Sequence, residues 1–285
     1  MGMRKKGLHL HQVIVAGILL LSGLYGLSLS AQKQVYVARY DGVINPVAAE
    51  YFSQVIRKAN EDHAAALLME LDTPGGLDES MRDIVKEISN SDVPVIVYVA
   101  PTGARAASAG VFITLSAHVA AMTPGTNIGA AHPVALGGGQ MDEEMRQKVE
   151  NDAAAYIKSI AEKHGRNSEW AEEAVRKSVS ITEKEAFDLK VIDIVAENRE
   201  ELLKAINGRE VTLPAGKIRL ETTGAVFEEL PMGLRLRILN TLSNPNVAYI
   251  LMILGIYGLF FELASPGAIL PGVVGAVCLV LAFYA

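Results

Sequence analysis

The feature that most restricts the possible folds of this chain is the uneven distribution of its charged residues. Two apolar blocks, Val13–Leu29 and Val247–Ala285, carry almost no charge, although 20% of the 285 residues are charged overall. Between the blocks lie about 200 residues of ordinary globular composition, which is enough to bury a core without crosslinks. We therefore expect one folded domain with membrane-directed segments on both sides.

The first apolar block has the composition of an export signal. A positive region at residues 4–6 precedes it, and small residues at 28–31 offer a cleavage site. We predict that residues 1–31 are a signal peptide or an uncleaved anchor. The basic residues then stay in the cytoplasm, and the chain after Gln32 is exported.

The second apolar block predicts helices that cross the membrane. Val247–Leu263 is long enough to span most of a bilayer, and Ile269–Ala285 is a second apolar run that ends without a polar flank. Glu262 lies at the end of the first run, where an interfacial position costs little. We expect a multi-pass protein of the cell membrane with an extracytoplasmic domain, in a chain truncated from something longer.

Composition excludes several classes of function. The net charge of −6 argues against nucleic acid as a partner, because no basic stripe is present to neutralise phosphates. The sequence has no phosphate-binding GxxxxGK[ST] loop and no Cys/His cluster with zinc spacing, so we expect neither a cofactor nor a metal. The single cysteine, Cys278, is interpreted as a small apolar filler.

The central segment alternates apolar runs with amphipathic stretches, which is typical of an α/β fold. The expected domain covers residues 32–206, and 207–246 is expected to be a connector to the membrane. Buried strands are predicted at residues 34–40, 64–71, 93–100 and 119–122, with a later strand at 191–195. Helices are predicted at 46–60, 77–88, 143–164 and 168–177.

Two turns could contribute catalytic groups, one that contains two glycines and one that contains a serine. Gly75 and Gly76 follow a buried strand, where Gly75 shapes the turn and Gly76 can present its N–H to a bound carbonyl. Ser108 lies among small residues before a buried helix, next to the N–H of Ala109 and the positive end of the helix dipole. This pattern is consistent with a nucleophile and two oxyanion donors, and equally with small residues that allow two elements to pack closely.

A serine nucleophile needs a base, and the residue pattern leaves the base open. A lysine can serve when burial favours its neutral form, and three lysines follow the glycine-rich loop: Lys148, Lys158 and Lys163. A Ser-His-Asp arrangement competes with this interpretation. Its members would be drawn from His118, His132, Asp72 and Asp142.

Three segments in order resemble one family: MELDTPGGLDESMRDIVKEI, APTGARAASAGVFI and AMTPGTNIGAAHPV. They are similar to the NfeD-type membrane-bound serine proteases, relatives of ClpP and of signal peptide peptidase A. The resemblance covers about residues 33–206 and implies a ClpP/crotonase-like α/β domain followed by transmembrane helices.

The resemblance also implies a mechanism and partners. It places the nucleophile at Ser108 and the base at Lys148, ten residues before the lysine of YIKS. It implies a Ser-Lys serine endopeptidase that cleaves apolar segments of peptides or membrane-associated proteins, with a stomatin-like partner. A homo-oligomer, at least a dimer, is also expected.

Two rival functions stay open. One is a non-catalytic membrane scaffold for a stomatin-like protein, and the other is an acyl-CoA enzyme of the crotonase branch. The export signal argues against the second rival, because that branch works in the cytoplasm. The glycine-rich stretch Thr123–Gln140 is interpreted as a gate over the site.

Overall fold

The computed structural model describes residues 33–134, 142–265 and 269–284. The expected signal segment at residues 1–31 lies outside the described residues, as does the last part of the expected gate, 135–140.

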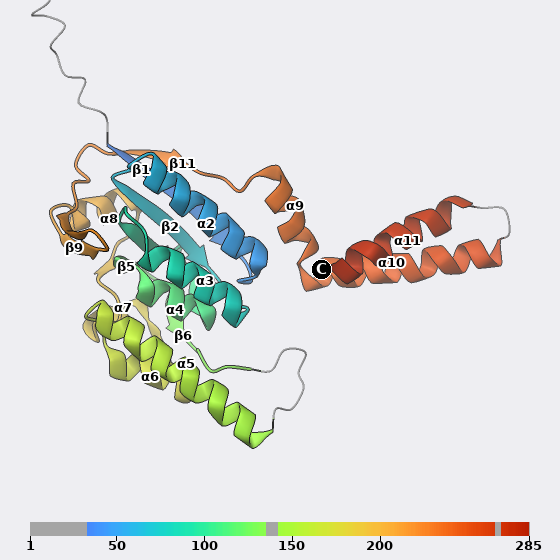
Figure 1. The fold of residues 1–285 in the computed structure, drawn as a ribbon, viewed down its shortest axis with the longest axis horizontal. Helices are drawn as coiled ribbons and strands as arrows, with labels where there is room; N and C mark the ends of the chain where they lie inside the picture. Colours follow the sequence, from blue (N-terminus) through green and yellow to red (C-terminus); the bar gives the residue numbers. More distant parts are fainter. Residues whose placement is uncertain (1–32, 135–141, 266–268, 285) are drawn as a thin grey trace, which may run out of the picture. The chain divides into compact units, whose positions relative to one another are not determined.

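A six-stranded parallel sheet forms the centre of the domain (Figure 1). Its strand order is β11-β1-β2-β3-β5-β8, and each neighbouring pair is parallel. The bounds are β1 Gln34–Asp41, β2 Ala66–Asp72, β3 Val95–Val99, β5 Val119–Met122, β8 Ile194–Val195 and β11 Val226–Glu229. The four strands predicted first are thus confirmed with small shifts at their ends.

Helices connect and cover these strands, as parallel pairing requires. The helices of the domain are α2 Pro46–Glu61, α3 Asp78–Ser89, α4 Ala109–Ser116, α5 Glu143–Lys163, α6 Ser168–Arg176, α7 Glu183–Asp188 and α8 Arg199–Ile206. Local signals fix their starts: the Asn45 side chain accepts a hydrogen bond from the Ala48 N–H, and Pro46 occupies the first turn of α2.

Successive side chains of the central strands enter two different cores. In β2, Leu67, Met69 and Leu71 face the core built with α2 to α6, whereas Ala66 and Leu68 face a smaller core built with α8. This alternation follows from the two-residue period of a strand. It explains why β2 and β3 are continuous apolar runs, since both faces of the sheet are covered.

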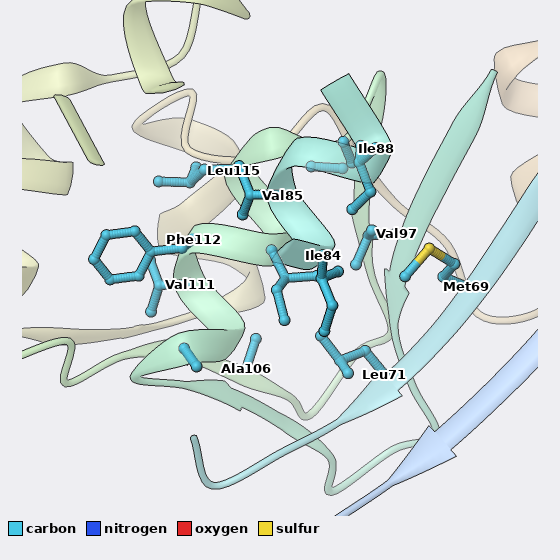
Figure 2. Close-up of a cluster of buried hydrophobic side chains, with 14 of the residues drawn as sticks. Met69, Leu71, Ile84, Val85, Ile88, Val97, Ala106, Val111, Phe112 and Leu115 are labelled. Carbon is cyan, nitrogen blue, oxygen red and sulfur yellow. The ribbon is translucent and has the colours of Figure 1, made fainter. Parts of the chain in front are cut away.

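Helix α4 is a core helix, with all eight residues buried. Figure 2 shows its side chains Val111, Phe112 and Leu115 in one cluster with Ile84 and Val85 of α3 and with side chains of β2 and β3. Because α4 is packed on all sides, its first turn is held rigidly relative to the ends of the strands.

A small second sheet meets the end of β2. It has the order β4-β6-β7, with bounds β4 Arg105–Ala107, β6 Asn127–Gly129 and β7 Ser180–Thr182. A parallel bridge joins Thr73 to Ala106, so the turn after β2 continues into this sheet. The sequence did not predict these three-residue strands.

The expected connector, residues 207–246, is largely ordered secondary structure. It contains the hairpin of β9 Glu210–Leu213 and β10 Gly216–Arg219, and the strand β11 that pairs with β1 in the main sheet. Helix α9, Leu234–Leu242, then packs on α2. The α/β domain therefore extends beyond residue 206, and β11 escaped prediction because its VFEE sequence lacks an apolar run.

Two apolar helices follow, α10 Pro245–Ala264 and α11 Ile269–Tyr284. Among the described helices, α10 alone is long and apolar enough to cross a membrane, judged by length and composition; α11 is shorter. The two pack closely through glycines: a methyl group on Gly258 would lie 2.8 Å from the Cα of Gly275. Such small-residue contacts are typical of helix pairs in membranes.

Candidate functional site

Ser108 occupies a strained turn at the start of α4. Its φ of 52° and ψ of −113° place a non-glycine residue in a region that side chains rarely adopt. Its N–H donates to the Gly129 carbonyl at 3.0 Å, and its carbonyl accepts from the Val111 N–H at 3.0 Å. The main chain on both sides of Ser108 is thus held in place while the half-buried side chain stays accessible.

Gly75 allows the turn after β2 to approach Ser108. A Cβ added at Gly75 would lie 2.6 Å from the Ser108 Cβ and 3.1 Å from its Oγ, and the φ of Gly75 is +119°. Both observations require glycine at this position. The buried Thr73 hydroxyl supports the turn, because its Oγ1 accepts from the Gly75 N–H at 3.1 Å.

Gly76 is fixed by the loop between β1 and α2. The Ile44 N–H donates to the Gly75 carbonyl, and the Leu77 N–H donates to the Ile44 carbonyl, both at 2.8 Å. A Cβ at Gly76 would lie 2.0 Å from the Ile44 oxygen, so a side chain is excluded. This parallel bridge uses one edge of the Gly75–Leu77 backbone and leaves the Gly76 N–H on the other edge.

Two backbone donors therefore border Ser108. Ala109 is the first residue of α4, so its N–H has no partner within the helix. Within the described segments, neither the Ala109 N–H nor the Gly76 N–H donates to a protein acceptor. Both are free for a ligand oxygen, and the N-terminal end of α4 adds a favourable field for negative charge.

Ser108, Gly76 and Ala109 line a cleft of about 710 Å³, together with residues of α3, α4 and α5. Apolar side chains form much of its wall: Leu77, Met81, Phe112, Pro133, Val134 and Val149. Charged side chains from α3 and α5 also line it. The cleft is thus wide enough and apolar enough to hold side chains of a peptide.

Lys148 of α5 lines the same cleft. Its side chain is 67% exposed, and its Nζ pairs with Glu144 Oε1 at 2.8 Å. The Lys148 side chain is therefore exposed and ion-paired, whereas a general base was expected in a shielded pocket.

The other two candidate lysines lie elsewhere. Lys158 pairs with Glu172 at 3.1 Å, and Lys163 lines a different groove between α3 and α5. Of the three lysines that the sequence left open, Lys148 alone lines the cleft with Ser108.

The structure does not assemble the alternative histidine arrangement. His118 lies just after the C-terminal end of α4, opposite Ser108, and its Nδ1 accepts from the Val95 N–H at 3.1 Å. Burial, together with the charges of Lys163 and Arg166, lowers its pKa to about 4. His132 bonds to the Val175 carbonyl through Nδ1 at 3.0 Å.

The two carboxylates of that alternative serve the backbone. Asp72 Oδ1 accepts from the Arg105 N–H at 3.0 Å, and Asp142 Oδ1 accepts from the Met145 N–H at 2.7 Å as the cap of α5. Neither carboxylate pairs with a histidine in the part of the chain that the structure describes. Within the described residues, no three His, Cys, Asp or Glu side chains form a metal-binding group.

Sequence reasoning missed the ion pairs that close one side of the cleft. Arg82 of α3 pairs with Asp78 at 2.8 Å and with Asp152 of α5, and its guanidinium lies 4.3 Å from the ring centroid of Tyr156. These contacts tie α3 to α5 beside Lys148. The Arg82–Asp152 pair leaves no local sequence signal, because the two residues are 70 positions apart, whereas Asp78 and Arg82 are four positions apart on one helix.

Comparison with models of protein families shows to which family the chain belongs. The model of the NfeD1b N-terminal domain matches residues 34–211, and that of the NfeD integral membrane domain matches residues 246–285. The chain belongs to the NfeD family. The predicted family is thereby confirmed, and a membrane location follows from the second match.

Two curated NfeD relatives align over most of the chain. Membrane-bound protease PH1510 of Pyrococcus horikoshii is 41% identical over 256 residues, covering 88% of this chain and 58% of the relative. Membrane protein NfeD1b of Bacillus subtilis is 30% identical over 284 residues, covering 94% and 60%. The chain thus spans about three fifths of the length of each relative.

Solved structures share the fold. The 1510-N membrane-bound stomatin-specific protease, as a lysine-to-alanine variant with a substrate peptide, has a TM-score of 0.69 and 38% identity over 74% of this chain and 98% of that one. A serine-to-alanine variant has a TM-score of 0.67 and 40% identity over 71% and 100%. The predicted α/β class, followed by apolar helices, is confirmed.

Proposed function

We propose that this NfeD chain is a membrane-bound serine endopeptidase with Ser108 as nucleophile and Lys148 as general base. The observation that carries the proposal is the placement of Ser108 at a strained helix start, between two free backbone N–H groups and inside a cleft that Lys148 also lines. A nucleophile, oxyanion donors and a candidate base around one cavity are the parts that acyl transfer requires.

The relatives support this assignment. PH1510 is named a membrane-bound protease, and its N-terminal domain has been solved with a substrate peptide. The serine and the lysine replaced in its two variants are separated by nearly the same number of residues as Ser108 and Lys148. Ser108 and Lys148 have a similar spacing and both line the cleft, and this supports the assignment.

The reaction follows from this geometry. Neutral Lys148 takes the proton of Ser108, and Oγ attacks the peptide carbonyl to form a tetrahedral intermediate. The N–H groups of Gly76 and Ala109 stabilise its oxyanion. The proton passes from Lys148 to the leaving amine, and water then hydrolyses the acyl-enzyme.

Lys148 acts as base only after it leaves its ion pair with Glu144. A bound substrate covers the cleft and excludes water, and this favours the neutral amine over the exposed ammonium group. The described part of the expected gate, Thr123–Val134, contains β6 and lines the cleft through Ala131, Pro133 and Val134. Closure of this segment over substrate stays a prediction.

Substrate choice follows from the cleft. An extended peptide can pair with the free backbone edge at Gly76 while its side chains enter the apolar wall formed by Met81, Phe112 and Val149. We therefore propose apolar segments of membrane-associated proteins as substrates. The stomatin specificity named for the relative makes a stomatin-like protein the proposed partner. We retain the proposals of a homo-oligomer, at least a dimer, and of a multi-pass topology with the domain extracytoplasmic.

The test uses the full chain in lipid nanodiscs. Peptide cleavage and labelling by a serine-reactive fluorophosphonate are compared for wild type, Ser108→Ala and Lys148→Ala. Lys158→Ala and Lys163→Ala are matched controls on the same helix. We expect no labelling of Ser108→Ala and a loss of about 10²–10⁴-fold in turnover for Lys148→Ala.

Each outcome separates the candidate functions. Equal activity of Lys148→Ala and Lys163→Ala would remove Lys148 from the mechanism and keep the protease. If the probe labels Ser108 in none of the preparations although the protein is folded, the non-catalytic scaffold is favoured.

A further inference from the structure

Helix α9 connects the α/β domain to the membrane domain and has two different faces. On one face Leu236 is 3% exposed within the main core. Asn240 accepts a hydrogen bond from the Tyr40 hydroxyl at 3.1 Å, and Arg235 pairs with Glu50 of α2 at 2.9 Å. These contacts fix α9 to the folded domain.

The other face of α9 is apolar and basic, and no described residue covers it. Leu234 is 71% exposed and Ile238 is 52% exposed, one helical turn apart. Arg237 is also exposed and lies next to Ile238, and its guanidinium donates a hydrogen bond to the Met232 carbonyl at 3.2 Å. A short helix with exposed apolar and cationic side chains has the composition of a segment that lies in a membrane interface.

Chain connectivity places this face near the bilayer. α9 ends at Leu242, and α10, in the match to the integral membrane domain, begins at Pro245. Three residue steps reach at most about 11 Å. Tyr249, in the first turns of α10, is 65% exposed, and tyrosine favours the membrane–water interface.

We propose that the exposed face of α9 docks on the surface of the bilayer. Leu234 and Ile238 enter the boundary between headgroups and acyl chains, and the guanidinium of Arg237 binds anionic lipid phosphates. Because the opposite face of α9 is packed on α2, this contact holds the α/β domain against the membrane surface. The proposal is independent of whether the domain cleaves peptides.

The test measures contact between α9 and lipid by fluorescence. The chain has one tryptophan, Trp170, which is buried and gives a constant background. Leu234→Trp and Ile238→Trp are reconstituted as full chains in vesicles that contain anionic phosphatidylglycerol and lipids brominated near the headgroups. Ile218→Trp, on β10 in the exposed hairpin, is the matched control at an apolar surface position.

We expect brominated lipid to reduce the added tryptophan fluorescence in both α9 variants and to leave Ile218→Trp unchanged. Adding Arg237→Gln should reduce the quenching in anionic vesicles, whereas Arg219→Gln on β10 should not. Quenching no greater at Leu234→Trp and Ile238→Trp than at Ile218→Trp would overturn the proposal.

Discussion

Replacing Gly75 by alanine should displace Ser108, and Gly103 provides a matched control. Both glycines have positive φ, +119° at Gly75 and +90° at Gly103. An alanine costs about 1–3 kcal/mol at such a φ, whatever the surroundings. A Cβ at Gly103 meets nothing within 4 Å, whereas a Cβ at Gly75 would lie 2.6 Å from the Ser108 Cβ.

The difference between the two variants isolates the contact with Ser108. Overpacking adds about 1–3 kcal/mol to the strain, so Gly75→Ala should lose about 2–6 kcal/mol in the free energy of unfolding and Gly103→Ala about 1–3 kcal/mol. A shift of the proposed nucleophile by about 1 Å costs about 10²-fold in rate. Gly75→Ala should therefore slow fluorophosphonate labelling of Ser108 by that factor, and Gly103→Ala should label as wild type does.

The assays are urea denaturation of the full chain in detergent and the rate of probe labelling below the unfolding transition. Labelling of Gly75→Ala at the wild-type rate would refute the reasoning, since it would mean that the turn moves instead of Ser108. Equal losses of stability in both variants would refute the proposed overlap.

Three further predictions concern stability and the membrane domain. Asp193→Asn removes the ion pair of the buried Arg166, so the free energy of unfolding should fall by about 3–5 kcal/mol in urea denaturation. Burial lowers the pKa of His118 to about 4 and that of His164 to about 3. Between pH 6.5 and pH 4 the unfolded chain therefore binds protons that the folded chain does not. The free energy of unfolding should fall with decreasing pH by up to about 1.4 kcal/mol per pH unit for each histidine, measured by urea denaturation at successive pH values. Gly258→Leu should separate α10 from α11, because a Cβ there would lie 2.6 Å from a backbone oxygen of α11, and the distance between spin labels on the two helices should increase.

The two substitutions have control variants in the same chain. Asp92→Asn, at an exposed aspartate, should alter the free energy of unfolding by less than about 0.5 kcal/mol. Gly233→Leu, where nothing lies within 4 Å, should leave the spin-label distance unchanged. Stability that stays constant from pH 6.5 to pH 4 would contradict the buried neutral histidines.

The sequence predicted the main sheet because parallel strands buried on both faces appear as continuous apolar runs, as in β2 and β3. It did not predict β4, β6, β7 or β11. These strands have three or four residues, and their pairing partners define them more than their own composition does. Arg105 pairs with Asn127, and Val226 pairs with Gln34. These pairings depend on the tertiary fold, and no local sequence pattern predicts them.

The sequence predicted those parts of the candidate site whose backbone geometry restricts the residue type. Gly75, Gly76 and Ser108 stand out because sharp turns and close approach select small residues. The choice among the lysines depended on the family resemblance, since their spacing along α5 does not reveal which one reaches the cleft. The exposure of Lys148 and its pair with Glu144 became visible only in three dimensions.

The glycine contacts around Ser108 have a consequence for how this protein can evolve. Sterics leave almost no freedom at Gly75 and Gly76, where any side chain meets Ser108 or the Ile44 backbone. Met81, Phe112 and Val149, which form part of the apolar wall of the cleft, come instead from three separate helices and take no part in those contacts. Mutations in that wall can alter which side chains fit while the backbone donors keep their positions. Lineages can therefore acquire new substrate preferences without first losing the site.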